Sequence, residues 1–199
     1  MVGSSKPTGS AISFHWLNPP NYSEFREGGL FVRTDHETDF WRETFYGFRR
    51  DSGHFYYRNV AGDFTAEVTI DGRYETLYDQ AGLMMRLGPA NWIKAGIEYT
   101  DGAACFSVVV TNDQSDWSLI TISPAPSGQR LRLTRHSEAI RVQYLDAGHN
   151  RWKMVRLAYL PRSASIDVGM MCCSPERSGF EVAFRDFTVG PAIARELHE

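Results

Sequence analysis

Residues Tyr78 to Tyr99 read YDQAGLMMRLGPANWIKAGIEY and predict two β-strands joined by the turn Gly88-Pro89-Ala90-Asn91. In the second half of this stretch, apolar and polar side chains alternate, which places them on opposite faces of a strand. The inward set is Ile93, Ala95, Ile97 and Tyr99, and the outward set is Trp92, Lys94, Gly96 and Glu98. The stretch therefore predicts a hairpin with one aliphatic face and one polar face.

The first half of the stretch alternates in the same way. Its inward set is Ala81, Leu83 and Met85, and its outward set is Gln80, Gly82, Met84 and Arg86. Each arm places a glycine in the middle of the polar face, where the absence of a side chain lets another group approach closely. We therefore expect the polar face to form the floor of a groove for a flat ligand.

The rest of the chain consists of short alternating segments separated by turns rich in Gly, Pro, Asn and Asp, and no segment keeps a helical period for three turns. The expected strands are 12–16, 30–34, 64–70, 105–111, 119–122, 130–135, 139–145, 152–159, 166–172 and 180–189. Residues 35–55 read as a long loop with embedded turns. So many strands without helices predict an all-β jelly-roll sandwich of two antiparallel sheets.

The length of 199 residues suits one sandwich domain with a sizeable core. Residues 1–10 are rich in Gly, Ser and Pro and are predicted to form a flexible N-terminal segment. We expect the domain to cover residues 11–190 and a C-terminal tail to cover 191–199.

Charge and composition argue against several functional classes. A net charge of -3 gives no cationic surface for nucleic acid or anionic lipid. The first ten residues lack the apolar centre of a signal peptide, and no apolar run reaches membrane-spanning length, so we expect a cytoplasmic protein. Phe, Trp and Tyr make up 13% of the chain, and aromatic rings are a common means of holding sugars.

The cysteines and histidines do not predict a metal site or a cofactor. Cys105, Cys172 and Cys173 form neither a disulfide framework nor a zinc-ligand spacing, and we expect reduced thiols. In a strand, the adjacent pair would place one thiol in the core and the other on the opposite face. The six histidines show no paired spacing.

Five groups of residues, in order along most of the chain, carry a resemblance to a known family: 38–41 with 46–47, 78–83, 92–98, 107–111 with 115–118, and 173–175 with 179–180. In these the chain resembles the bacterial and fungal domain-of-unknown-function family that includes the yeast regulation-of-enolase protein. The resemblance implies a concanavalin A-like sandwich, the shape of legume lectins and several glycosidases. By that analogy, carbohydrate binding is a plausible function.

The first functional hypothesis is a non-catalytic module that binds a carbohydrate or another small polar ligand. Lys94 and Glu98 share a strand face but lie about 13 Å apart at ~3.3 Å per residue, so each needs a partner on a neighbouring strand, such as Gln80 or Arg86. The predicted ligand-binding residues are Gln80, Arg86, Trp92, Lys94 and Glu98 on the sheet face, with Trp41, Trp117 and Asp116 in loops at its rim.

Two alternatives from other classes stay open. Glu37, Asp39 and Glu43 fit the spacing Glu-x-Asp-x-x-x-Glu of one group of concanavalin A-like glucanases, which predicts a glycoside hydrolase with a carboxylate pair; capping of a loop by Asp39 is the structural alternative. The family resemblance implies instead an intracellular regulatory partner of a metabolic enzyme. The hydrolase, kinase and redox motifs with specific spacing are absent from the sequence, which favours a non-catalytic protein.

Overall fold

The computed structural model describes residues 13–26, 28–122 and 128–197, and these ranges form β-strands joined by turns and loops. The strands are β1 (His15–Leu17), β2 (Tyr22–Arg26), β3 (Gly29–Arg33), β4 (Phe40–Arg42), β5 (Arg49–Asp51), β6 (His54–Ala61), β7 (Phe64–Gly72), β8 (Gln80–Gly88), β9 (Asn91–Thr100), β10 (Ala103–Asn112), β11 (Gln114–Thr121), β12 (Gln129–His136), β13 (Ala139–Asp146), β14 (Arg151–Tyr159), β15 (Ser165–Cys173) and β16 (Glu181–Pro191). Within the described ranges, no helix is long and apolar enough to cross a membrane.

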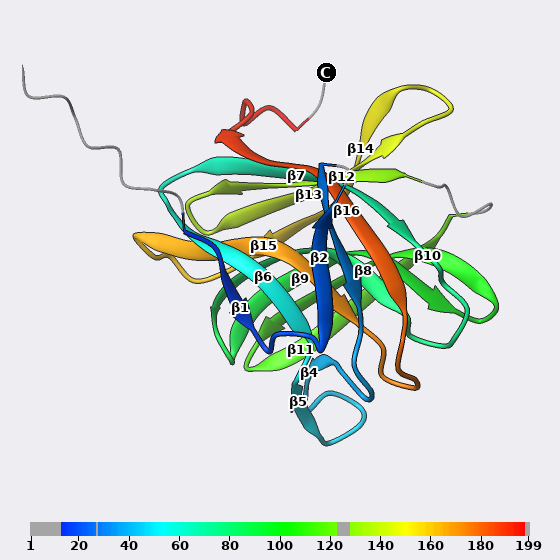
Figure 1. Cartoon of the computed structure of the whole chain (residues 1–199). Helices are drawn as coiled ribbons and strands as arrows, with labels where there is room; N and C mark the ends of the chain where they lie inside the picture. The colour runs from blue at the N-terminus through cyan, green and yellow to red at the C-terminus, as the bar shows by residue number, and fades with distance from the viewer. Residues whose placement is uncertain (1–12, 27, 123–127, 198–199) are drawn as a thin grey trace, which may run out of the picture.

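Two antiparallel sheets of seven strands each pack face to face (Figure 1). Sheet A has the order β1-β6-β15-β8-β9-β10-β11, and sheet B has the order β14-β13-β12-β7-β16-β3-β2. The short strands β4 and β5 form a separate hairpin beside sheet A, at one end of the sandwich in Figure 1. The predicted all-β sandwich of two antiparallel sheets is confirmed.

The hairpin of β8 and β9 lies in the middle of sheet A with the predicted turn and the predicted faces. Gln80 pairs with Glu98, and Met84 pairs with Lys94, so the polar residues of both arms share one face. The aliphatic residues of the opposite face, Ala81, Leu83, Met85, Ile93, Ala95 and Ile97, are buried between the two sheets. Period-two alternation therefore assigned both faces of this hairpin correctly.

Gly82 and Gly96 pair with each other across β8 and β9, and both are needed for the close approach of the strands. A Cβ atom at Gly82 would lie 1.9 Å from the carbonyl oxygen of Ala95, and one at Gly96 would lie 2.0 Å from that of Ala81. Glycine is thus required by the backbone itself. A space of about 10 Å³ also lies over Gly96, enough for about one water molecule.

The outer face of sheet A carries a second apolar cluster and is not open to solvent. Its buried members are Phe40, Trp41, Phe55, Met84, Trp92, Val109, Met171 and Cys173. Phe40 and Trp41 belong to β4, so the β4–β5 hairpin covers the outer side of the sheet. The expectation of one loop over residues 35–55 was therefore wrong, because this segment contains β4, β5 and the beginning of β6.

Smaller differences from the sequence prediction have local causes. The prediction missed β2, whose residues are mostly exposed and show no alternation, and Trp117 lies within β11 rather than in a loop. The three cysteines are free and buried, with Cys172 in the core between the sheets and Cys173 in the outer cluster, as predicted. The predictions for residues 1–10 and for the last two residues lie outside the described ranges.

The inward face of β9 should control stability. Ile97, which is 2% exposed, is expected to lose about 2–5 kcal/mol of unfolding free energy on Ile97→Ala, because the truncation leaves a cavity in the core. Ile120→Ala on β11 is the matched control, since Ile120 is 46% exposed and its truncation should change the free energy by about 0.5 kcal/mol or less. Urea unfolding of both variants tests this, and equal losses would contradict the assigned faces.

Candidate functional site

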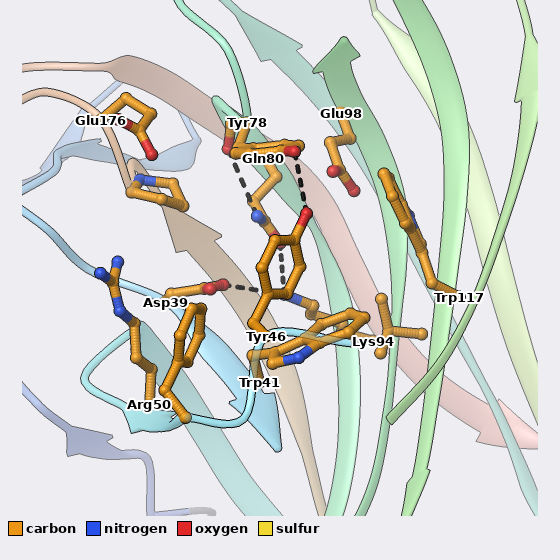
Figure 2. A pocket seen from close by; sticks show the side chains of 13 residues that line it. Asp39, Trp41, Tyr46, Arg50, Tyr78, Gln80, Lys94, Glu98, Trp117 and Glu176 are labelled. Atoms are coloured by element: carbon orange, nitrogen blue, oxygen red, sulfur yellow. Dashed lines mark hydrogen bonds and ion pairs between the residues drawn. The ribbon is translucent and has the colours of Figure 1, made fainter. Parts of the chain in front are cut away.

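A cavity of about 270 Å³ lies between the outer face of sheet A, the β4–β5 hairpin and the loop that precedes β16 (Figure 2). Sheet A supplies its floor, the hairpin segment supplies one wall, and the loop supplies another. The lining residues are Asp39, Trp41, Tyr46, Phe48, Arg50, Tyr78, Gln80, Lys94, Glu98, Val109, Trp117, Pro175 and Glu176. Aromatic and charged side chains therefore meet in one partly open space.

Lys94 is the centre of the polar network on the floor. Its Nζ donates to Oε1 of Gln80 at 2.6 Å and to Oδ1 of Asp39 at 3.2 Å. Burial alone would lower the pKa of Lys94, but the carboxylates of Asp39 and Glu98 outweigh it and raise that pKa above its ordinary value. Lys94 is thus a buried ammonium with two partners. Gln80 is the cross-strand partner that the sequence predicted, and Asp39 belongs to the segment that precedes β4.

Glu98 lies on the same floor, and its carboxyl group faces the cavity beside Trp117 (Figure 2). Burial raises the pKa of Glu98, while attraction to Lys94 and hydrogen bonding to Ser107 and Trp117 act in the opposite direction. The Trp117 indole N–H is itself directed to the Ser107 hydroxyl at 3.0 Å. A carboxylate offers about four acceptor positions, so Glu98 retains acceptor capacity toward the cavity.

The aromatic walls are held by contacts among themselves. The rings of Trp41 and Trp117 meet edge to face, with centroids 6.4 Å apart, and the Trp41 indole donates to the carbonyl of Thr44 at 2.9 Å. Tyr46 stacks on Phe48 with centroids 5.3 Å apart, and its hydroxyl lies 3.2 Å from that of Tyr78. This hydrogen bond and burial raise the pKa of Tyr78, so its hydroxyl stays protonated at neutral pH.

The hairpin wall is tied to sheet A by hydrogen bonds at two places. Arg86 on β8 binds both carboxylate oxygens of Asp51, at 2.9 and 2.8 Å. On the other side, the backbone N–H of Arg42 donates to the Ser115 hydroxyl at 2.9 Å, and its side chain donates to the carbonyl of Asp113 at 3.1 Å. The wall is thus anchored to both β8 and the β10–β11 connection.

The loop wall is anchored through an ion pair between Arg177 and Asp79. Asp79 is fully buried and accepts hydrogen bonds from Arg177 and from the backbone N–H groups of Glu75 and Thr76. Arg177 follows directly after Pro175 and Glu176 in the chain. The ion pair therefore holds this wall next to the start of β8.

Five of the eight residues predicted from the sequence line the cavity: Gln80, Lys94, Glu98, Trp41 and Trp117. The structure does not bring the other three, Arg86, Trp92 and Asp116, to it. Arg86 is used to anchor Asp51, and Trp92 is 1% exposed, packs on Phe40 and donates its N–H to the carbonyl of Pro89. Asp116 faces away from the cavity and pairs with Arg156 at 3.1 Å.

The cavity is also lined by residues that were not predicted from the sequence: Tyr46, Phe48, Arg50, Tyr78, Val109, Pro175 and Glu176. Tyr78 could have been found, because it falls on the outward set of its arm together with Gln80. Asp39 has the capping role considered as the structural alternative, since its carboxylate accepts the N–H of Phe40 at 2.8 Å, and it also binds Lys94, a contact that was not predicted.

The glucanase-like spacing does not assemble a carboxylate pair in the cavity. Asp39 lines it, but Glu37 is exposed and lies 3.5 Å from His36, and Glu43 pairs with Arg49 on the hairpin. In the part of the chain that the structure describes, no group of three or more His, Cys, Asp or Glu side chains could hold a metal ion.

The fold and the cavity define a β-sandwich domain with an aromatic-walled, charged site on the outer face of one sheet. Residues 16–192 match the family described as protein of unknown function DUF1349, and the chain belongs to this family. A protein of Saccharomyces cerevisiae named "Regulation of enolase protein 1" is 45% identical over 92% of both chains. An uncharacterised protein of Emericella nidulans is 28% identical over 59% of this chain and 61% of its own length.

Solved structures agree with this assignment. The crystal structure of a functionally unknown protein from Saccharomyces cerevisiae matches with a TM-score of 0.86 and 43% identity, over 91% of this chain and 97% of that one. A xylan β-1,4-xylosidase from Bacillus halodurans matches with a TM-score of 0.64 and 16% identity, and the similarity covers 83% of this chain but 33% of the xylosidase. This second similarity concerns the sandwich fold alone.

Removing the buried ammonium should strongly destabilise the protein. Lys94→Met leaves the carboxylates of Asp39 and Glu98 without their cation, and we expect a loss of about 3–5 kcal/mol in unfolding free energy. Lys153→Met is the matched control, because Lys153 forms its ion pair with Asp146 at the surface, where water screens the pair, and its loss should be much smaller than that of Lys94→Met. Denaturant unfolding at neutral pH tests this. Equally small losses of unfolding free energy in both variants would show that Lys94 does not stabilise the floor of the cavity.

When one carboxylate of an ordinary ion pair is removed, the loss of stability grows as the pH rises. For Glu98→Gln we expect the opposite dependence of stability on pH. Because burial raises the folded-state pKa of Glu98 above 4.5, wild type loses stability as the pH rises from 4.5 through that raised pKa. Glutamine cannot ionise, so the stability of the variant relative to wild type should increase over the same range. Unfolding curves from acidic to neutral pH measure this difference, and a difference independent of pH would contradict it.

Proposed function

We propose that the chain is a non-catalytic module that binds a small carbohydrate or a similar hydroxylated ligand in the cavity between sheet A and the β4–β5 hairpin. The observation that supports this proposal is that aromatic rings and fixed polar groups surround the same cavity. Sugars combine apolar C–H faces, which pack on aromatic rings, with hydroxyl groups that need donors and acceptors. Trp41, Trp117 and Tyr46 suit the first requirement.

The polar floor suits the second requirement. Gln80 and Lys94 are already oriented by their mutual hydrogen bond, and Glu98 supplies acceptor oxygens. Because these groups are held before a ligand arrives, binding would not have to order them. The volume of about 270 Å³ lies just below the ~300 Å³ at which sites for drug-sized ligands begin, which favours a ligand of one or two sugar rings.

A ligand screen with matched tryptophan variants tests this function. Saturation-transfer NMR with a panel of monosaccharides and disaccharides should identify ligands of wild type, and Trp117→Leu should weaken them at least about tenfold because the stacking surface is lost. Trp152→Leu is the control, since Trp152 lies on β14 of sheet B, and it should leave binding unchanged. Absence of any ligand would contradict the proposal, and cleavage of a disaccharide in the same spectra would support the glycoside hydrolase alternative.

We propose, as a second function, that the chain regulates a metabolic enzyme by direct contact. The supporting observation is the name of its 45% identical yeast relative, which refers to the regulation of enolase. Enolase is therefore the first partner to test. Such a role would be exercised in the cytoplasm, the location that the sequence predicts.

Purified enolase from the source organism should co-elute with the chain in size-exclusion chromatography, and its activity should change on titration with the chain. An unrelated cytoplasmic enzyme is the control and should do neither. Separate elution at micromolar concentrations, together with unchanged activity, would contradict the regulatory proposal.

A further inference from the structure

The floor of the cavity contains more buried negative than positive charge. Asp39 and Glu98 are carboxylates and Lys94 is an ammonium, and they are 8%, 4% and 4% exposed. Lys94 donates hydrogen bonds to Asp39 and Gln80, whereas Glu98 is attracted to the Lys94 ammonium only over a longer distance. An uncompensated buried charge is costly, so Glu98 requires a proton or another cation.

The other charges that line the cavity do not remove this excess. Glu176 lies at the upper left and Arg50 at the lower left of the view in Figure 2, away from Glu98, and together they contribute one negative and one positive charge. The lining as a whole thus has three carboxylates against two cations. A ligand that brings one positive charge would make the occupied cavity neutral.

The rings near Glu98 also favour a cation. Trp117 and Tyr78 line the cavity together with Glu98, and Trp41 stands edge to face with Trp117. Aromatic faces attract cations electrostatically, and this attraction is strongest for tryptophan and increases when water is excluded. The space in front of Glu98 is therefore both anionic and aromatic.

We propose that the ligand carries a protonated amine, as an amino sugar does, and that the ammonium binds Glu98 between the aromatic walls. This inference rests on the proposed carbohydrate-binding function and specifies its ligand class. The hydroxyl groups of the ligand would bind Gln80 and Lys94. A neutral sugar of the same shape would leave Glu98 without its counter-charge.

Calorimetric titration of wild type with glucosamine, glucose and N-acetylglucosamine tests the inference, at about pH 6.5 so that the amine is protonated. Glucosamine should bind at least about tenfold more tightly than the two neutral sugars, because a hydrogen bond between charged groups in a buried site is stronger than a neutral one. Glu98→Gln should abolish this preference and change the affinity for the neutral sugars by about threefold or less. Glu24→Gln on β2 of sheet B, outside the cavity, is the matched control and should keep the preference.

The outcomes separate the inference from the function on which it rests. Equal or tighter binding of glucose or N-acetylglucosamine to wild type would overturn the cationic ligand and leave carbohydrate binding intact. A preference for glucosamine that survives in Glu98→Gln would overturn the role of Glu98. If none of the three sugars nor any member of the wider panel binds, both proposals fail.

Discussion

The buried ion pair between Lys94 and Asp39 is the interaction on which the site depends. Lys94 lies in the middle of the central hairpin of sheet A, and Asp39 directly precedes β4, so their contact ties the covering hairpin to the floor beneath it. Without Asp39, the ammonium would be buried with only Gln80 as a close partner, which is unfavourable for a charge. This contact adds to the anchors of the hairpin at Arg86 and Arg42, and it is the one that lies inside the cavity.

Sheet A is covered by apolar packing on both of its sides. Its inner face joins the main core, and its outer face carries a second cluster in which Phe40 of β4 packs on Trp92. Beside this cluster, Lys94, Asp39 and Glu98 are almost fully buried. Their electrostatic interactions are therefore stronger than those of the many exposed ion pairs on sheet B.

The sequence predicted the fold and the floor because both depend on local alternation. The outward positions of residues 80–86 and 92–98 were assigned correctly, and Gln80, Lys94 and Glu98 came together as their register required. The alternation of apolar and polar residues predicts which face of a strand a side chain occupies, but it does not predict which other elements cover that face. Trp92 and Trp117 both lie on strands of sheet A, yet Trp92 is beneath Phe40 and Trp117 lines the cavity.

The walls could not be predicted because they depend on distant contacts and on unusual backbone. The hairpin strands are three residues long, too short for a recognisable period, and Glu43, Phe45 and Gly47 between them have positive φ angles. The two walls come from separate segments, each fastened to sheet A by its own arginine–aspartate pair, Arg86 with Asp51 and Arg177 with Asp79. A change of length or sequence in one wall can therefore leave the other wall and the floor in place.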